Sequence, residues 1–348
     1  MKKHKVLDLF SGCGGMSLGF EQAGFEIKLG IDNWDESLAT FKNNHYHSDI
    51  LCADLAKLKP TELKKEYGEI AVIIGGPPCQ GFSISGKRNP NDPRNKLYQS
   101  FVSFVDHFKP NAFVMENVPN LVAMNGGNVK TQIIKEFESI GYKVTYKIMM
   151  ASDYGVPQNR KRVVFVGLKN GVEFKFPEGG YINQKITASE AISDLPDEEI
   201  QDGSSYILAP QSEYQRWIRE GSSGIYNHQI TKHTDQTKSI IGLVPDGGNY
   251  KNLPEELQDT RRVNIAWTRL NSKKPSFTID TGHNHHFHYK YNRVPTPRES
   301  ARIQSFPDTF IFHGKKNDQL KQIGNAVPPL LGKVVAEELL KYLGANDV

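Results

Sequence analysis

A cysteine that follows two prolines is the residue of this chain best suited to covalent chemistry. The segment Gly75-Gly76-Pro77-Pro78-Cys79 comes directly after an apolar run at 70–74. Prolines fix φ, and glycines let other groups approach the backbone closely. A lone cysteine is more often a buried structural residue, which is how we interpret Cys52. The stiff turn favours a presented thiol instead, so we interpret Cys79 as a nucleophile.

An acid stands at the tip of the next apolar run, in Phe113-Val114-Met115-Glu116-Asn117-Val118. In doubly wound sheets, ligands bind beyond the carboxyl ends of the strands. Cys79 and Glu116 both follow such ends, so we expect them to meet and to act on one substrate.

A basic stretch, Gln158-Asn159-Arg160-Lys161-Arg162, precedes the apolar run 163–167. In an extended chain, side chains alternate, which would put Gln158, Arg160 and Arg162 on one face. Guanidinium groups suit a carbonyl oxygen or a phosphate. A solvated basic turn is the alternative reading of the same residues.

A glycine-rich turn follows the first apolar run. Gly12, Gly14 and Gly15 lie in it, and Asp32 stands 20 residues after Gly12, the spacing of an acid that binds ribose hydroxyls. Ser17 takes the place of the third glycine of the dinucleotide fingerprint, so we expect a nucleoside cofactor without a pyrophosphate. Asp54 could accept from an adenine amino group. A tight turn with a capping acid is the alternative.

The elements that carry these residues alternate between strand and helix through the first half of the chain. Strands are expected at 6–10, 27–32, 70–74, 112–116, 143–150 and 163–167, with helices at 16–23, 37–43, 97–108 and 129–140. This alternation predicts an α/β fold with a doubly wound, mostly parallel sheet. The alternation stops near Lys169. We expect one domain from 1–169 plus 315–348, and a smaller, irregular, β-rich domain at 170–314.

Composition narrows the class of protein. The 348 residues carry a net charge of +4, which permits nucleic-acid binding without requiring it. Three cysteines and no CxxC pair argue against a disulfide framework or a cysteine zinc site. The N-terminal apolar run is too short for a signal peptide, and no stretch is long enough to span a membrane. We expect a cytoplasmic, nucleoid-associated protein.

These blocks, in this order, resemble the cytosine-C5 DNA methyltransferases of bacterial restriction-modification systems. The resemblance implies a Rossmann-like methyltransferase core, S-adenosyl-L-methionine as the methyl donor, Cys79 as the nucleophile and Glu116 as the acid. It further implies that Arg162, with Arg160, holds the target base. The cofactor pocket implied by the resemblance and the glycine turn consists of Phe10, Ser11, Gly12, Gly14, Gly15, Asp32, Asn33, Asp54, Leu55, Pro78, Leu97, Asn325 and Val327.

The residue types fit that reaction independently. C5 of cytosine becomes nucleophilic when a thiolate adds to C6 and an acid supplies a proton at N3. A cation near O2 would assist. A base inside a duplex must be flipped out before a thiol and a methyl donor can both reach it.

The region 170–290 would then recognise the target sequence. The expected nucleic-acid contacts are Gln80, Ser83, Arg261, Arg262, Arg269, Lys273, Thr278, His283, His285 and Arg298. The histidines at 283–288 would alternate between two faces of a strand, so we expect base or phosphate contact and no metal.

Two other functions share these features: a tRNA cytosine-C5 methyltransferase with the same core, and a non-catalytic DNA-binding regulator. A NAD-dependent dehydrogenase ranks below both because of Ser17. The expected partner is duplex DNA, with no membrane. We expect a monomer, and a cognate restriction endonuclease, if there is one, acting on the same site without a stable complex. The recognition sequence cannot be read from the chain.

Overall fold

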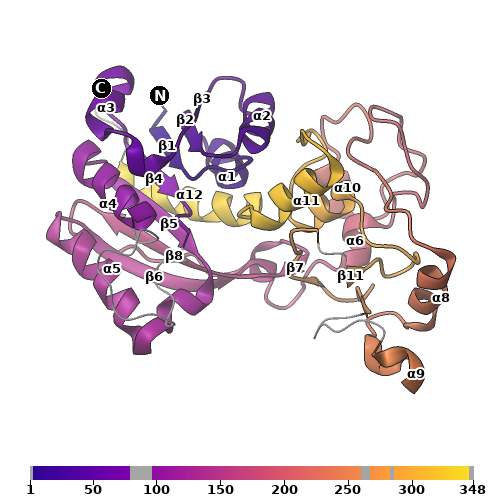
Figure 1. The fold of residues 1–348 in the computed structure, drawn as a ribbon. Helices are drawn as coiled ribbons and strands as arrows, with labels where there is room; N and C mark the ends of the chain where they lie inside the picture. The colour runs from indigo at the N-terminus through magenta and orange to yellow at the C-terminus, as the bar shows by residue number, and fades with distance from the viewer. Residues whose placement is uncertain (1–2, 79–95, 260–266, 283–285, 345–348) are drawn as a thin grey trace. The chain divides into compact units, whose positions relative to one another are not determined.

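The computed structural model describes residues 3–78, 96–259, 267–282 and 286–344 (Figure 1). The chain divides into two compact units. The first comprises 1–150, 161–178 and 329–348, and the second comprises 151–160 and 179–328.

A seven-stranded sheet forms the centre of the first unit. Its order is β3-β2-β1-β4-β5-β8-β6, in which β8 runs antiparallel to β5 and β6 and the other pairs are parallel. The strands are β1 (Lys5–Leu9), β2 (Glu26–Asp32), β3 (Asp49–Cys52), β4 (Val72–Gly75), β5 (Ala112–Asn117), β6 (Lys143–Met150) and β8 (Lys161–Leu168). The doubly wound, mostly parallel sheet expected from the sequence is confirmed.

Helices cover the sheet. They are α1 (Gly15–Gln22), α2 (Asp35–Asn44), α3 (Pro60–Tyr67), α4 (Lys96–Phe108), α5 (Asn128–Ser139) and α12 (Pro329–Leu343), with the 3-10 turns η1 (Leu55–Lys57), η4 (Pro119–Val122) and η5 (Met124–Gly127). Helices α1 and α12 pack against each other so closely that a Cβ at Gly19 would stand 2.5 Å from the backbone of Lys333. A glycine is therefore required at that crossing.

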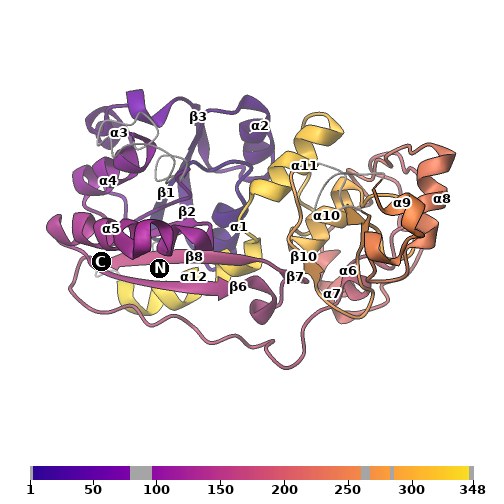
Figure 2. The same cartoon turned by 60° about the horizontal axis from the view of Figure 1, so that its bottom comes forward.

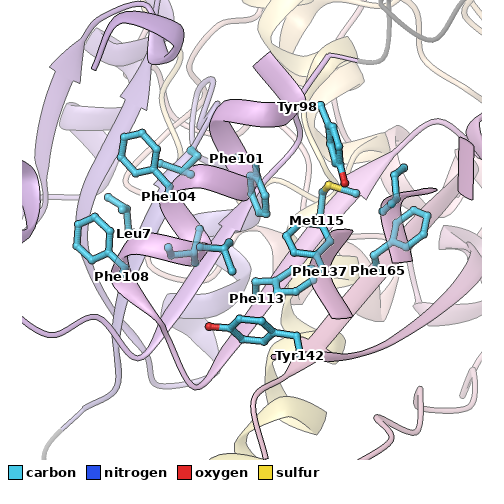
Figure 3. Close-up of a cluster of buried hydrophobic side chains, with 14 of the residues drawn as sticks. Leu7, Tyr98, Phe101, Phe104, Phe108, Phe113, Met115, Phe137, Tyr142 and Phe165 are labelled. Carbon is cyan, nitrogen blue, oxygen red and sulfur yellow. The ribbon is translucent and has the colours of Figure 1, made fainter. Parts of the chain in front are cut away.

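Aromatic side chains fill the space between α4, α5 and the sheet (Figure 3). The apolar face of α4 presents Phe101, Phe104 and Phe108, each at most 1% exposed, as its helical spacing predicts. Phe113 of β5 stacks on Phe137 of α5 with ring centroids 4.0 Å apart. The first unit thus rests on a conventional apolar core.

Two elements of this unit escape sequence-based prediction. Strand β3 lies at the edge of the sheet with three of its four residues exposed, and α3 carries a single buried residue, Leu63. Neither therefore has the apolar periodicity that marks a buried element. The expectation that Cys52 is a buried structural cysteine is wrong, because edge strand β3 leaves it exposed, whereas Cys13 is buried.

The second unit contains little regular structure (Figure 2). Its described strands are two residues long: β7 (Gln158–Asn159), β9 (Thr268–Arg269), β10 (Ser276–Phe277) and β11 (His286–Phe287). Its helices are α6 (Ala188–Ile192), α7 (Glu213–Ile218), α8 (Asp235–Leu243), α9 (Glu255–Gln258), α10 (Pro297–Ile303) and α11 (Lys316–Asn325), with the turns η6 (Ala151–Tyr154) and η7 (Tyr250–Asn252). The expected irregularity is found, but the described part is not β-rich, because short helices hold more of it than strands do.

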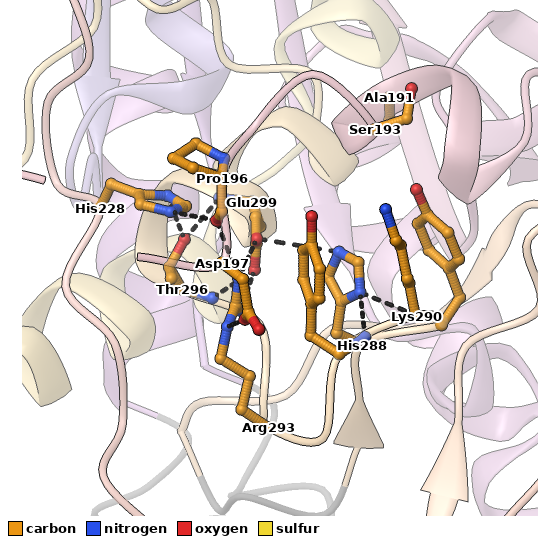
Figure 4. A network of polar contacts seen from close by, with 12 residues as sticks. Ala191, Ser193, Pro196, Asp197, His228, His288, Lys290, Arg293, Thr296 and Glu299 are labelled. Carbon is orange, nitrogen blue, oxygen red and sulfur yellow. Dashed lines mark hydrogen bonds and ion pairs between the residues drawn. The ribbon is translucent and has the colours of Figure 1, made fainter. Parts of the chain in front are cut away.

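Buried charges replace a sheet as the scaffold of the second unit. Arg302 is fully buried on α10 and pairs with Asp194 at 2.5 Å and with Asp308 at 2.6 Å. Arg293 donates to both carboxylate oxygens of Glu299 at 2.8 Å (Figure 4). Burial would raise the pKa of Glu299, but Arg293 and His288 outweigh it and hold that pKa well below its usual range.

Helix α10 begins as its sequence predicts. The Thr296 hydroxyl accepts from the Glu299 N–H, and the Glu299 carboxylate accepts from the Thr296 N–H, with Pro297 in the first turn. The same glutamate therefore caps the helix and pairs with Arg293, which fixes α10 to the loop that precedes it.

Candidate active site

The glycine turn between β1 and α1 has an unusual backbone. Phe10 adopts φ 62°, and Gly12 and Gly14 adopt φ 54° and 94°. A left-handed φ is uncommon for a phenylalanine and marks a backbone that its surroundings hold in place. The Ser11 N–H donates to the Ile31 carbonyl at 3.0 Å, which ties the turn to β2.

Asp32, at the end of β2, makes the second tie. Its Oδ2 accepts from the Gly12 N–H at 2.9 Å, and its Oδ1 accepts from the Trp34 N–H at 3.0 Å. Burial raises the pKa of Asp32, while these N–H donors act in the opposite direction. Each carboxylate oxygen keeps capacity for a further donor, such as a hydroxyl group.

The glycine turn leaves open space beside its backbone and contains a polar atom without a hydrogen bond. A Cβ at Gly12 would meet nothing within 4 Å. The Ser11 hydroxyl oxygen is buried and has no hydrogen-bond partner among the described residues. Of the other residues expected to contact a cofactor here, Asn33 is exposed. The Asp54 carboxylate caps η1 by accepting from the Ala56 N–H at 3.0 Å.

The remaining candidates for the cofactor pocket are less uniform. Leu55 is buried, Leu97 is half-buried and Pro78 is exposed. Asn325, exposed at the end of α11, and the half-buried Val327 belong to the second unit. The structure thus brings Ser11, Gly12 and Asp32 together at one turn.

The loop after β4 lies against the end of β5. A Cβ at Gly76 would stand 3.0 Å from Oε2 of Glu116, so only a glycine lets the carboxylate sit there without displacement. The Asn117 side-chain amide donates to the Pro77 carbonyl at 2.7 Å and is buried. The sequence analysis gave Asn117 no role, although it directly follows Glu116. Cys79, Gln80 and Ser83 lie outside the described residues.

Glu116 also meets one of the predicted arginines. Nε of Arg162 lies 2.7 Å from Oε1 of Glu116, and their side chains are 15% and 12% exposed. The pair forms because β5 and β8 are antiparallel neighbours, with Glu116 opposite Val164. An acid and a cation are therefore held together beside the loop that carries Pro77.

Arg160 does not join them, and its expected role at the target base is not supported. Its side chain is fully buried in the second unit, and its guanidinium donates to the carbonyls of Gly324 at 2.7 Å and Ala326 at 3.2 Å. The alternation predicted for Gln158, Arg160 and Arg162 fails because β7 ends at Asn159 and β8 begins at Lys161.

Two glutamines add hydrogen bonds around the turn that Arg160 contacts. The Gln158 amide donates to the Gln304 side chain, and the Ile279 N–H donates to Gln158 at 3.0 Å. Gln304 in turn donates to the Ala326 carbonyl at 2.6 Å. Arg160, Gln158 and Gln304 thus hold the turn that ends α11, a structural role for which the sequence carried no signal.

Two predicted DNA contacts are corrected by burial. Arg298 is fully buried and donates to the carbonyls of Tyr226, Pro307 and Phe310. Arg269 is 5% exposed and donates to the carbonyls of its own unit, among them Ile241 at 2.5 Å. Both arginines support loops instead of meeting a phosphate or a base.

Two of the other predicted DNA contacts lie at the protein surface. Lys273 and Thr278 are exposed. Arg261, Arg262, His283 and His285 lie outside the described residues. His288, from the same histidine-rich run, is buried, and burial lowers its pKa to about 4. Among the described residues, no group of three or more histidine, cysteine or carboxylate side chains could hold a metal ion.

Comparison with known proteins shows the family. Residues 4–341 match the model of the C-5 cytosine-specific DNA methylases. The chain belongs to this family. It is a methyltransferase that acts on DNA, which confirms the family and the activity expected from the sequence. In the part of this methylase that the structure describes, no helix has the length and apolar character needed to cross a bilayer.

Individual relatives cover nearly the whole methylase. Type II methyltransferase M.DdeI of Desulfomicrobium norvegicum is 40% identical, over 97% of this chain and 88% of that protein. Type II methyltransferase M1.HphI of Haemophilus parahaemolyticus is 39% identical, over 96% and 86%. A solved structure from E. coli, described as a prophage-encoded DNA modification methyltransferase, is 27% identical with a TM-score of 0.82 and covers 99% of this chain and all of that one.

Proposed function

We propose that this methylase transfers a methyl group from S-adenosyl-L-methionine to C5 of a cytosine in duplex DNA through a covalent bond between Cys79 and C6. Glu116 supplies the proton at N3, and Arg162 stabilises the developing charge near O2. The observation that carries this proposal is the 2.7 Å contact between Glu116 and Arg162 beside the Gly76-Pro77 backbone. An acid, a cation and the loop that leads to the thiol thereby share one place.

The residues of the glycine turn fit S-adenosyl-L-methionine. The unpartnered Ser11 hydroxyl, the open space over Gly12 and the acceptor capacity of Asp32 offer a donor, a close approach to the backbone and a site for ribose hydroxyls. When bound, the cofactor supplies an electrophilic methyl group on a sulfonium. We extend the pocket to Phe10, Gly14, Gly15, Asn33, Asp54, Leu55, Pro78, Leu97, Asn325 and Val327 on the family resemblance.

The protein's own residues divide the remaining chemistry. Attack by the Cys79 thiolate on C6 and protonation of N3 by Glu116 convert the ring to an enamine whose C5 is nucleophilic. After methyl transfer, a base removes the proton from C5 and the thiolate leaves, which restores the aromatic ring. Asn117 holds Pro77 by its carbonyl, and this contact keeps the cysteine loop against β5. General acid catalysis of this kind is worth about 10²–10⁴ in rate.

The relatives that carry the name Type II methyltransferase support a modification role in a restriction-modification system. We propose that the methylase acts as a monomer on duplex DNA, flips its target base, and works beside an endonuclease that reads the same site. We further propose that residues 1–169 and 315–348, which contain the first compact unit except 170–178, form the catalytic domain. Residues 170–314, which belong to the second unit from 179 onward, recognise the sequence, with Lys273 and Thr278 as exposed contacts.

Covalent trapping tests the mechanism. A duplex in which 5-fluorocytosine replaces the target cytosine should form a denaturation-resistant complex with the wild-type protein when S-adenosyl-L-methionine is present. Cys79→Ala should bind the duplex and give neither adduct nor methylation. Normal turnover by Cys79→Ala would refute the mechanism.

The nucleic-acid substrate is tested separately. Transfer of a tritiated methyl group to duplex DNA should exceed transfer to tRNA, and the reverse result would favour the tRNA methyltransferase. Bisulfite sequencing of DNA from cells that express the protein would then locate the modified cytosine and its flanking bases.

A further inference from the structure

A second carboxyl group lies beneath the glycine turn and takes no part in the proposed chemistry. Asp8, on β1, is 1% exposed, and Ser17, on α1, is fully buried. The Ser17 hydroxyl donates to Oδ2 of Asp8 at 2.6 Å. This hydrogen bond joins the strand before the turn to the helix after it, so it spans the segment that contains Phe10, Gly12 and Gly14.

Asp8 and Asp32 occupy contrasting environments. Asp32 accepts two backbone N–H groups and remains partly open, which suits an anion that binds hydroxyl groups. Asp8 receives the Ser17 hydroxyl deep in the core, where an uncompensated carboxylate would be costly. Burial raises the pKa of Asp8 to about 8, Ser17 opposes the rise and Asp32 adds to it. The two nearby carboxyls therefore differ in what surrounds them: backbone N–H donors at Asp32 and one serine hydroxyl in the core at Asp8.

Among the described residues of the neighbouring elements, no positive charge acts on Asp8. Strand β4 contributes Val72–Gly75, which has no titratable side chain, and β2 contributes Asp32, while Lys28 on β2 pairs with Glu26 at 3.0 Å. In the turn, Cys13 is buried and its thiol pKa is raised. Helix α1 carries a single acid, Glu21, which pairs with His45 at 2.7 Å. Within the described residues, the environment of Asp8 thus favours the neutral acid.

We propose that Asp8, as a neutral carboxylic acid, and Ser17 are positioning residues that hold the glycine turn in its cofactor-binding shape. Ser17 stands where the dinucleotide fingerprint has a glycine, and its hydroxyl is the donor that Asp8 requires. This Asp8–Ser17 pair, called the strut below, adds no negative charge beside Asp32, the carboxylate that we propose binds the cofactor. This inference rests on the proposed use of S-adenosyl-L-methionine.

Substitutions at both ends of the strut separate a neutral acid from a carboxylate. Asn has the donor and acceptor pattern of a protonated Asp, so Asp8→Asn should bind S-adenosylhomocysteine within about twofold of wild type at pH 7, measured by isothermal titration calorimetry. Asp8→Ala and Ser17→Ala should each bind about tenfold more weakly, the scale of one buried hydrogen bond. Ser48→Ala is the matched control, because Ser48 is a buried serine that donates to the Ile27 carbonyl at 2.8 Å, away from the turn.

A second measurement needs no ligand. When the pKa of an acid is higher in the folded protein than in the unfolded chain, the free energy of unfolding falls as the pH rises from the unfolded pKa toward the folded pKa. The thermal midpoint of the wild-type protein should therefore fall relative to that of Asp8→Asn between pH 5 and pH 8, whereas Ser48→Ala should follow wild type.

The outcomes divide cleanly. Tenfold loss of affinity in Asp8→Asn, wild-type affinity in Ser17→Ala, or parallel pH curves for wild type and Asp8→Asn would each overturn the strut. If wild type fails to bind S-adenosylhomocysteine while the pH curves diverge as expected, the proposed cofactor is at fault and Asp8 is still the neutral acid. If wild type binds but Ser17→Ala binds equally well, the strut fails and the proposed function stands.

Discussion

The two units of this methylase reach a fixed structure by different physical means. In the first, a continuous sheet satisfies the backbone and an aromatic core that includes Phe113 and Phe137 removes apolar surface from water. In the second, backbone ladders are two residues long, and buried arginines such as Arg293 and Arg302 join loops by pairing with carboxylates and carbonyls. An irregular region can therefore be well defined when its charges are internal and paired.

This difference has a consequence for how each unit responds to change. Apolar packing weakens gradually as atoms are removed. A buried ion pair fails abruptly, because losing one partner leaves the other charge unpaired in the interior. Substitution of a buried, paired arginine in the second unit should therefore cost more stability than substitution of an aromatic core residue in the first unit.

Removing Arg302 should have the largest effect. Arg302→Met removes the cation that bridges the buried Asp194 and Asp308 and leaves them with the more distant Arg219 at 3.0 Å and Arg298 at 3.5 Å. We expect a cost of about 3–5 kcal/mol in the free energy of unfolding. Urea unfolding followed by tryptophan fluorescence measures this cost, since Trp217 and Trp267 both lie in the second unit. Arg216→Ala, which removes an exposed arginine paired with Glu213, is the control and should change stability by less than about 0.5 kcal/mol. A loss below 1 kcal/mol for Arg302→Met would contradict the comparison.

Acid should destabilise the second unit next. Burial lowers the pKa of His288 to about 4, below its ordinary value of 6.5, and Arg293 and Arg269 add to the shift while Glu299 opposes it. Its Nδ1 accepts two backbone N–H groups in the core. A base with a lowered folded pKa contributes stability above pH 6.5 that is lost as the pH falls toward 4, which amounts to about 3 kcal/mol. His288→Asn keeps an acceptor and should flatten this part of the stability curve. Equal slopes in wild type and variant would argue against the assignment.

The aromatic core should give a smaller, graded loss. Phe137→Leu removes part of a ring stacked on Phe113 and should cost about 1–2 kcal/mol, with no dependence on pH between 4 and 7. Chemical unfolding at both pH values measures it. A loss as large as that of Arg302→Met would show that the two units do not differ in the way proposed.

The exposed basic surface of the second unit should affect binding and leave stability unchanged. Lys273→Ala should shift the unfolding free energy by less than about 0.5 kcal/mol and reduce the salt dependence of DNA binding by about one counterion. Fluorescence anisotropy across a salt series measures that slope. An unchanged salt dependence in Lys273→Ala would show that Lys273 does not contact DNA.

The sequence by itself determined the α/β core and most of its elements. Apolar runs of five or more residues and the period of α4 reflect burial, which is a local property of the chain and can be read from it. The capping box of α10 and the meeting of Glu116 with the loop after β4 followed in the same way, because strand ends share an edge of a sheet. Edge strand β3 and helix α3 were missed because exposure removes that pattern.

Only the tertiary structure decided which charged residues face outward. Arg160, Arg269 and Arg298 have the same side chain as Arg162, and no local pattern separates an arginine that supports a loop from one that meets a substrate. The choice depends on which carbonyls and carboxylates lie nearby, and these come from residues up to 166 positions away in the chain. The pairing of Asp8 with Ser17 was likewise set by the tertiary structure, since burial and not residue type raises the pKa of that acid.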